Sequence, residues 1–373
     1  MANGNHIYTP VVKGKMYDLK ALGKLSASAR AVVKPLVEAM PVPKERSIEE
    51  HLDKFSHYLK KYYPLGSIFI DFYGLMPGAI TSEGHSGVIA GYKLLKMKGR
   101  IGTPTYGFER DDSIWTALRE IVDSFGQGFC FRIELEDMDD AAEDTWANII
   151  GRTAELGLNP SEIDLLVDLR DVGKSDVSDL KERVIDFLSY KPIDHEYRTI
   201  TVAGSSALKT VTEIKKDGEG DVARNELFIW SQLQVDLGES QEIIYGDYGV
   251  IHPEFSNAGA NKNKNAKIRY THGTGIRYFR GHKLADPPGF AQFHGLAERV
   301  RNSTVYRGKA FSFGDAQIDN CADLNTGTGH LGTWVQADMN HHIEYVTHQM
   351  VGLRVEIQKV STLDSLEDLL WAT

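Results

Sequence analysis

The sequence predicts an α/β protein built on a (β/α)8 barrel of the TIM type, with a C-terminal β-hairpin and helical extension. Short runs rich in β-branched and aromatic residues alternate with segments of helical periodicity, which is typical of a parallel sheet wound by helices. Eight such runs can be counted, and they span about the 250 residues that this barrel needs. An open doubly wound sheet is the alternative, because periodicity alone does not show whether a sheet closes.

The eight runs and the segments between them give the predicted elements in order. The strands cover residues 7–13, 34–39, 67–72, 100–106, 128–134, 163–168, 198–203 and 242–247. The helices cover residues 17–33, 47–63, 85–98, 112–125, 139–156, 177–189 and 223–235. Ser47 followed by Glu50 matches a capping box, and Gly157 gives the helix before it a C-terminal stop.

The pattern changes after the eighth strand. Residues 253–266 are rich in Asn, Gly and Lys, which predicts a surface loop. The segment AKIRYTHGTGIRYFRG predicts a hairpin over 267–281, followed by helices at 289–302 and 333–350 and a last strand at 351–360. We therefore expect a barrel core of residues 1–252 and an extension of residues 253–373 that packs on it within one structural unit.

Composition and charge argue against several classes of protein. The 373 residues include 42 Lys and Arg against 52 Asp and Glu, and the net charge of −10 disfavours a protein that coats duplex nucleic acid. Cys130 and Cys321 are too few for a disulfide framework and follow no metal-ligand spacing, so we expect inert thiols in a reducing cytoplasm. No apolar run approaches the roughly 18–20 residues that cross a bilayer, so we expect no membrane partner.

Charged side chains stand at the carboxyl ends of the predicted strands, where the loops of such a barrel form its active site. The segments FRIELED and LLVDLRD place ionisable groups where a buried strand is usually apolar. These groups must pair with one another, bind a ligand or titrate. Cations and carboxylates together suit phosphate-ester or nucleotide chemistry, because cations hold the phosphate while carboxylates hold a divalent cation or transfer protons.

Two sets of candidate site residues follow from these strand ends. The candidate catalytic residues are Glu38, Asp168, Asp247 and His341, and the candidate ligands of a divalent cation are Asp168 and Asp247. The candidate anion-binding residues are Lys13, Lys15, Arg132, Arg170, Gly204, Ser205, Tyr248, Arg269, Tyr270 and Arg280. Asp71, Tyr73 and Glu134 occupy further strand ends. The competing interpretations are a ring of ion pairs that only closes the barrel mouth, and an ordinary turn with a helix cap at Gly204 and Ser205.

Two further motifs carry less weight. The segment TGTGHLG matches a dinucleotide fingerprint, but no strand clearly precedes it, so a glycine-rich loop before the helix at 333–350 is the better interpretation. His341, Glu344 and His348 would form one stripe on that helix, and a solvated face is a better explanation than a metal site. If the helix caps the barrel mouth, an imidazole is placed to act as a general base.

Several segments, taken in order, resemble the beta family of bacterial and phage-encoded proteins nearly end to end. These segments are YTPVVKGKMYDLKAL, VVKPLVEAMP, IDLLVDLRDV, TVAGSS, GDYGVIHP, KIRYTHGTGIRYFRGH, AFSFGDAQI and TGHLGTWVQADMNHHIEYV. The residues that match the family pattern are Lys13, Lys15, Glu38, Asp168, Gly204, Ser205, Gly246, Asp247, Tyr248, Arg269, Tyr270, Arg280, Gly281, Gly314, Asp315, Asn340 and His341. Asp18 departs from the pattern, which has a Gly-Glu pair at this point, so no family role is carried over to it.

The resemblance implies a role in antiviral defence, because the name-giving member belongs to a satellite-prophage cassette linked to host killing and phage exclusion. It assigns no catalytic role to any residue. We expect a component of an anti-phage defence or toxin–antitoxin-like module, with a partner protein and an anion-binding, hydrolytic barrel mouth that acts on a phosphoester or nucleotide with a divalent cation. The alternatives are a non-enzymatic barrel that senses a phage product or restrains a toxic partner, and ordinary small-molecule metabolism on the same fold. A homo-oligomer and a nucleic-acid ligand stay open.

Overall fold

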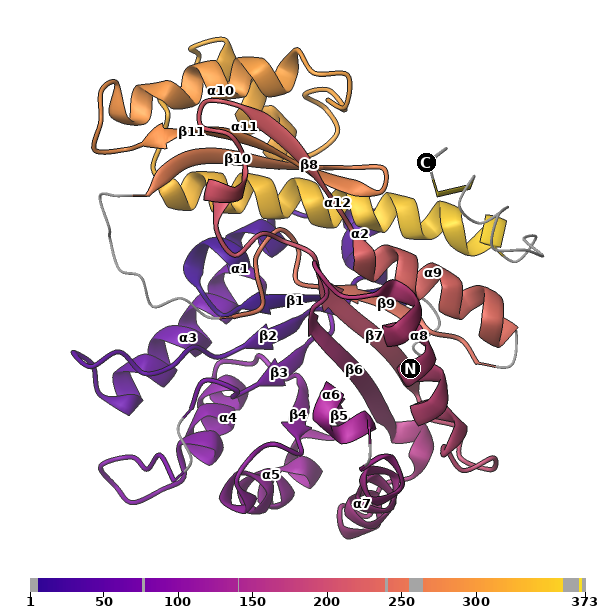
Figure 1. The fold of residues 1–373 in the computed structure, drawn as a ribbon. Helices are drawn as coiled ribbons and strands as arrows, with labels where there is room; N and C mark the ends of the chain where they lie inside the picture. The colour runs from indigo at the N-terminus through magenta and orange to yellow at the C-terminus, as the bar shows by residue number, and fades with distance from the viewer. Residues whose placement is uncertain are drawn as a thin grey trace.

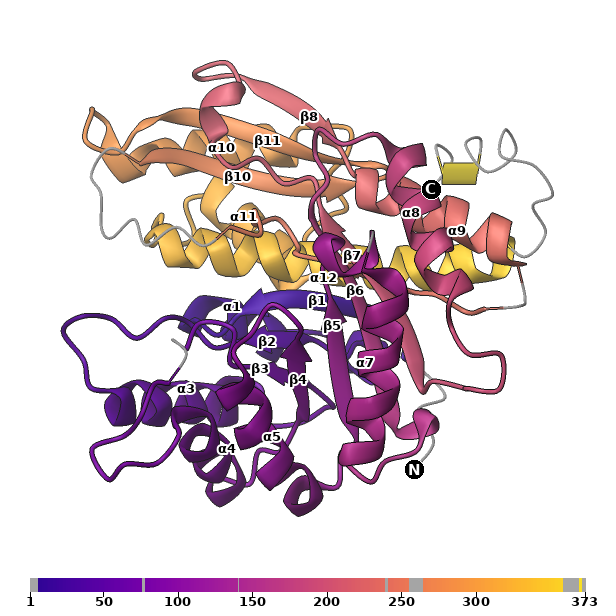
Figure 2. The same cartoon turned by 60° about the horizontal axis from the view of Figure 1, so that its bottom comes forward.

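The computed structural model describes residues 6–75, 78–139, 141–238, 241–254, 264–357 and 369–370. Eight parallel strands close into a barrel in the order β1-β2-β3-β4-β5-β6-β7-β9, which confirms the predicted fold class (Figures 1 and 2). They are β1 (Tyr8–Lys13), β2 (Leu36–Glu38), β3 (Phe69–Asp71), β4 (Thr103–Gly107), β5 (Phe129–Ile133), β6 (Ile163–Asp171), β7 (Thr199–Ser205) and β9 (Ile244–Asp247). Because β1 pairs with both β2 and β9, the ring is complete and the open-sheet alternative is wrong.

Alternate side chains of the strands fill the barrel, since successive residues of a strand point to opposite faces. Val11, Leu36 and Phe69 lie in register on neighbouring strands. They belong to one buried apolar cluster with Cys130, Leu166, Ala203 and Tyr248. The interior is thus packed with side chains, and a polar site on this barrel has to lie at one of its ends.

The helices that follow the barrel strands keep the predicted order, with the short α6 as an addition that was not predicted. They are α1 (Met16–Gly23), α2 (Ala27–Val32), α3 (Ile48–Tyr62), α4 (Gly87–Met97), α5 (Asp112–Phe125), α6 (Leu135–Met138), α7 (Ala142–Glu155), α8 (Val177–Ser189) and α9 (Asn225–Leu237). Ser47 and Glu50 form the predicted capping box of α3. Gly157 follows α7 with a φ of 66°, a left-handed conformation that suits glycine and ends the helix.

The predicted helix 17–33 is divided into α1 and α2 by a tertiary contact. Ser26 caps α2 by accepting a hydrogen bond from the amide of Ala29 at 3.1 Å. Glu344, far along the chain, accepts hydrogen bonds from the Ser26 amide at 2.5 Å and from the Ser26 hydroxyl at 3.0 Å. The interruption therefore depends on a partner that local periodicity does not reveal.

A second unit, which we call the cap, covers one side of the barrel. Its sheet has the order β10-β11-β8 and contains β8 (Glu219–Ala223), β10 (Asn265–His272) and β11 (Gly275–Lys283). The predicted hairpin corresponds to β10 and β11, which pair antiparallel. The cap also contains η4 (Gly289–Ala291), α10 (Gln292–Arg301) and α11 (Phe313–Ala322), of which α11 was not predicted. Strand β8 comes from within residues 1–252, so the cap does not begin at residue 253 as expected.

Helix α12 (Leu331–Ile357) lies between the barrel and the cap (Figures 1 and 2). It contacts α1, β1 and α9 on one side and β10 and α11 on the other. His341 and Glu344 are therefore buried, and the expectation of a solvated face is wrong for them. The expected strand at 351–360 is also wrong, since residues 351–357 continue α12 and residues 358–360 lie outside the described residues. None of the helices described is both long and apolar enough to cross a bilayer.

The amino end of the barrel is closed by an ion pair cluster around Asp164. Lys34 donates to Asp164 Oδ2 at 2.9 Å, and Arg198 donates to the same oxygen at 2.6 Å and to Oδ1 at 3.0 Å. Thr199 donates to Oδ1 at 2.6 Å. Burial opposes ionisation of Asp164, but these partners outweigh it and lower its pKa to about 2. The amino end of such barrels serves stability, and this cluster fits that role.

We expect Asp164→Asn to lower the free energy of unfolding by about 2–3 kcal/mol at pH 7, because the pKa falls from its ordinary value by roughly two units. The ionised carboxylate stabilises the fold above pH 4, and this contribution is lost as the pH falls towards 2. Urea unfolding of both proteins between pH 7 and pH 2.5 measures the difference, with the exposed Asp123→Asn as control. If the two proteins differed in free energy of unfolding by the same amount at every pH, the ionised Asp164 carboxylate would not be the source of the stability.

Candidate functional site

Arg132 occupies the centre of the barrel mouth, at the carboxyl end of β5, and its side chain is completely buried. Nε and Nη2 donate to Asp168 Oδ2 at 2.8 and 2.6 Å, and Nη1 donates to Asp71 Oδ2 at 2.8 Å. Nη2 also donates to the Tyr248 hydroxyl at 2.8 Å. Nη1 lies 2.9 Å from Glu38 Oε1, as an ion pair without a well-aligned hydrogen bond. One guanidinium thus joins residues from β2, β3 and β6 and the residue after β9.

Each carboxylate around Arg132 has another cation or donor. Lys13 on β1 donates to Glu38. Arg110, in the loop after β4, donates to both oxygens of Asp71 at 2.5 and 2.8 Å. We call this group the mouth network, and its members are Lys13, Glu38, Asp71, Arg110, Arg132, Asp168 and Tyr248. Arg110 was not predicted, although the charged run GFERDD after the fourth strand was a signal for it.

The mouth network holds Asp71 and Asp168 in the ionised form. Burial raises the pKa of Asp71, but the guanidiniums of Arg110 and Arg132 outweigh it and keep this pKa below its ordinary value. Burial raises the pKa of Asp168 in the same way, and the charges of Arg132 and Arg170 reverse the shift. The Tyr248 hydroxyl also donates to Asp168 Oδ2 at 2.5 Å. Inside the mouth, the candidate residues therefore neutralise one another.

Three residues form a rim above the mouth network: Tyr73, Glu134 and Arg170. Arg170 has a φ of 57°, in the left-handed region that a non-glycine residue rarely adopts, where the pairing of β6 and β7 changes register. Its Nη2 donates to the Tyr73 hydroxyl at 3.3 Å, and its guanidinium lies 5.2 Å from the centre of the Tyr73 ring. Tyr73 is 37% exposed, so this rim reaches solvent.

Glu134 is a weakly held partner of Arg170. Its Oε1 lies 3.6 Å from Arg170 Nη1 and has no hydrogen bond within the described ranges. The Glu134 side chain also forms a capping box with Asp137 at the start of α6. Burial, and then the charge of Asp168, raise the pKa of Glu134 to about 7. A carboxyl group that titrates near neutral pH can both accept and donate a proton, which is what general acid–base catalysis needs.

Asp247 does not join the mouth network, because it points to the outer face of the barrel. It comes directly before Tyr248, which points inward, and alternate residues face opposite sides. Asp247 accepts hydrogen bonds from the Tyr8 hydroxyl at 2.6 Å and from His342 Nε2 at 2.9 Å. Burial lowers the pKa of His342, so its ring is neutral and Nδ1 can accept from the Thr271 hydroxyl at 2.7 Å. The expectation that Asp168 and Asp247 share one site is therefore wrong.

His341 and Tyr270 lie inside the cap and not at the barrel mouth. His341 is completely buried, and its Nδ1 and Nε2 lie 2.8 Å from Asp315 Oδ2 and 2.9 Å from the carbonyl of Thr271. Tyr270 stacks on His341 with 3.8 Å between ring centres and donates to Asp315 Oδ1 at 2.6 Å. Both nitrogens of His341 face acceptors, so the structure offers it no substrate proton and contradicts its expected role as a base.

The other predicted anion-binding residues are spread over the structure. Arg280 donates to the carbonyls of Ile214 and, at 3.3 Å, of Thr212 in the cap, so it is not part of the barrel mouth. Ser205 accepts from the amide of Ala207 at 3.2 Å, as the turn interpretation expects for the segment with Gly204. The remaining two, Lys15 and Arg269, lie where α1 and β10 meet α12.

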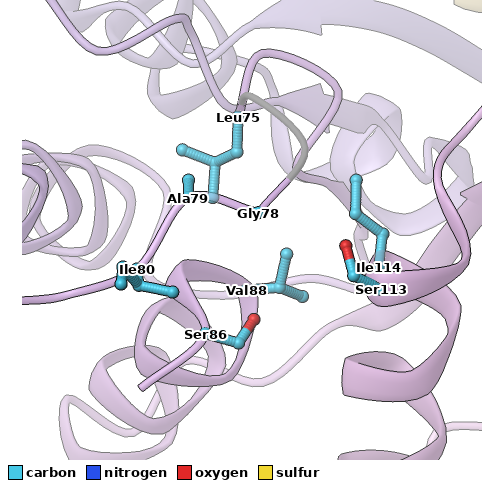
Figure 3. A pocket seen from close by; sticks show the side chains of 8 residues that line it. All are labelled: Leu75, Gly78, Ala79, Ile80, Ser86, Val88, Ser113 and Ile114. Atoms are coloured by element: carbon cyan, nitrogen blue, oxygen red, sulfur yellow. The ribbon is translucent and has the colours of Figure 1, made fainter. Parts of the chain in front are cut away.

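Neither a metal-binding group nor a described cavity coincides with the mouth network. Within the described ranges, no three His, Cys, Asp or Glu side chains are grouped so that they could hold a metal ion. One cavity, of about 120 Å³, lies between the loop before α4 and the start of α5. Figure 3 shows the residues that line it: Leu75, Gly78, Ala79, Ile80, Ser86, Val88, Ser113 and Ile114. A second cavity of about 500 Å³ lies between α3 and α4. Both lie outside the barrel.

A protein-family model described as Beta protein matches residues 8–348, which include all eight barrel strands, the cap and most of α12. The chain belongs to the Beta protein family. No curated protein matches it. Among solved structures, triosephosphate isomerase from Bartonella henselae is similar to it over 64% of this chain and 90% of that chain, with 13% identity and a TM-score of 0.34. The matched range includes every residue of the mouth network and of the rim.

We expect Arg132→Met to lower the free energy of unfolding by about 3–5 kcal/mol, because it leaves three buried carboxylates without their shared cation. Urea denaturation at pH 7 measures the loss. The exposed Arg119→Met is the matched control and should change stability by less than about 0.5 kcal/mol. A comparable small change for Arg132→Met would show that the mouth network does not stabilise the barrel.

Proposed function

We propose that this Beta protein is a component of an anti-phage defence or toxin–antitoxin-like module, and that the rim of its barrel binds an anionic, phosphorylated ligand. The observation that carries the anion-binding part is the arrangement of Arg170. Its backbone is held in an unfavourable conformation, its guanidinium lies against a half-exposed Tyr73, and its counter-ion Glu134 is weakly held. Strained backbone of this kind persists where the surrounding structure fixes it, and it is concentrated at functional sites.

The charges of the rim explain how an anion would bind. The other cations of the mouth contact buried carboxylates at hydrogen-bond distance, so they are already neutralised. Arg170 Nη1 lies 3.6 Å from Glu134 and 3.9 Å from Asp168, and it donates to the Tyr248 hydroxyl at 3.4 Å, so both of its ion pairs are longer than a hydrogen bond. A ligand oxygen at hydrogen-bond distance would add a stronger interaction than either. A planar guanidinium presents two parallel N–H groups, which match the oxygens of a phosphate or carboxylate.

If the bound ligand is hydrolysed, Glu134 is the group that we assign to proton transfer. Its pKa of about 7 lies close to physiological pH, and its side chain is partly exposed beside Arg170. The earlier candidates Glu38 and Asp168 are buried and already bonded to cations. In this form of the proposal, Arg170 holds the anion and Glu134 donates a proton to, or accepts one from, the ligand or an attacking water.

A non-enzymatic binding module is the second candidate. It is favoured by the mutual neutralisation within the mouth network, which leaves its carboxylates without access to a ligand. In that case the rim would bind a phage product or a partner protein without turnover. Tyr73 and Arg170 suit such a surface, since tyrosine and arginine are enriched at the centres of protein interfaces.

We expect anion binding at the rim to be stronger at pH 6 than at pH 8, because Glu134 is protonated below its pKa and no longer neutralises Arg170. Sulfate and bis(4-nitrophenyl) phosphate are suitable probes, since their charges are constant over this range. Calorimetric titration of Glu134→Gln should give an affinity at pH 8 close to that of the unaltered chain at pH 6, without further pH dependence. The neighbouring, exposed Glu136→Gln is the control. An unchanged pH profile in Glu134→Gln would contradict the proposal.

We expect Arg170→Gly to abolish protection against phage in cells that carry the chain with its module, because glycine accepts the left-handed backbone while the Arg170 side chain, with its guanidinium, is removed. Efficiency of phage plating measures protection, and circular dichroism checks the fold. Arg119→Gly would disturb a helix, so Arg119→Ala on α5 is the better control. Protection that survives Arg170→Gly, together with a partner protein that still copurifies, would support the binding module over the anion site.

A further inference from the structure

A second group of charged residues lies at the seam between the barrel and the cap, outside the mouth network and the rim. Lys15 and Asp18 come from the start of α1, Lys267 and Arg269 from β10, and Asp338 from α12. Helix α12 packs against both α1 and β10, which brings the three elements together. We call these five residues the seam cluster. Lys15 interacts electrostatically with Asp18, Asp18 with Arg269, and Lys267 with Asp338.

Arg269 and Asp338 fix the geometry of the seam cluster. Arg269 Nε donates to Asp338 Oδ2 at 2.9 Å, and the Arg269 amide donates to the same oxygen at 3.2 Å. Arg269 Nη1 donates to the carbonyl of Val250 at 2.7 Å, next to the end of β9. This pair joins the cap to the barrel and to α12, and it holds one oxygen of Asp338 in a defined position.

Two buried carboxylate oxygens of the seam cluster receive no hydrogen bond from the part of the chain that the structure describes. They are Asp18 Oδ1 and Asp338 Oδ1, on side chains that are 2% and 1% exposed. Burial raises the pKa of Asp18 to about 6 and raises that of Asp338 above its ordinary value. A buried acceptor without a donor costs free energy, so native proteins usually supply one from the chain, from water or from a ligand.

Lys267 adds a further cation to the seam cluster. Its ammonium group has no hydrogen-bond or ion-pair partner among the residues that the structure describes. Burial, and then the charge of Arg269, lower its pKa to about 7. Lys267 and Arg269 are two residues apart on one strand and so face the same side of β10. An anion placed between them would stabilise the charged form of Lys267.

We propose that the seam cluster is a second ligand site, for a small phosphorylated compound that also carries hydroxyl or amino groups. The phosphate would accept hydrogen bonds from Lys267, and the hydroxyl or amino groups would donate to the two unpartnered oxygens of Asp18 and Asp338. A divalent cation fits this site less well, because Lys15, Lys267 and Arg269 lie around the carboxylates and would repel it. The inference does not depend on the anion site at the rim.

Ribose 5-phosphate is the probe that combines both chemical features, and inorganic phosphate and ribose each carry one of them. Calorimetric titration at constant ionic strength should show ribose 5-phosphate binding at least tenfold more tightly than either of the others. Lys267→Met should weaken binding of both phosphates at least tenfold. Asp18→Leu, which removes the acceptor and adds no donor, should lower the preference for ribose 5-phosphate over inorganic phosphate. The exposed Lys61→Met on α3 is the matched control and should bind like the unaltered chain.

Arg170→Gly separates this proposal from the proposed function. Binding of ribose 5-phosphate that persists in Arg170→Gly and is lost in Lys267→Met supports the seam site, even if the rim binds nothing. Equal binding by Lys267→Met and Lys61→Met, or no binding of ribose 5-phosphate by the unaltered chain, would overturn it. Thermal unfolding of each variant without ligand shows whether a loss of binding comes from a loss of folding.

Discussion

The buried charge of Arg132 is the constraint on which the rest of the barrel mouth depends. A guanidinium without access to water must be neutralised by groups that contact it, and one strand cannot supply them all. Asp71, Asp168 and Glu38 come from three other strands, and the sheet has to curve into a barrel for them to meet at Arg132. The ends of β2, β3, β5 and β6 are consequently fixed relative to one another. The rim residues are built on this rigid base, which lets Arg170 keep its unfavourable backbone conformation.

Most of the barrel could be predicted from local pattern, because a buried parallel strand and an amphipathic helix each leave a periodic signal. All eight strands were found in this way, and so was the β10–β11 hairpin. The local pattern did not reveal features that depend on contacts between residues far apart in the sequence. Glu344 divides a predicted helix at Ser26, and the cap takes β8 from a segment that was counted within the barrel core.

The candidate site was predicted well where alternation along a strand decides the outcome. Lys13, Glu38, Arg132 and Asp168 meet because each lies at an inward position near a strand end. The same alternation places Tyr248 inside the barrel and its neighbour Asp247 on the outer face. The prediction of Asp247 as a site residue did not take this into account. The position of His341 could not be predicted from the sequence. Helix α12 is buried on two sides, and its polar side chains bond to the cap on one side and to α1 on the other. The spacing of polar residues along one helix does not reveal such partners.

The position of β8 has a consequence for how the polypeptide is made. The chain leaves the barrel after β7, enters the cap as β8 and returns to the barrel as α9, so the two units are interlaced and no single cut separates them. During synthesis β8 emerges well before its neighbour β11. The hydrogen bonds between β8 and β11 can form only after the β10–β11 hairpin has left the ribosome. Barrel closure between β1 and β9 is completed in the same interval. The cap sheet is therefore completed only after every strand of the barrel has been made.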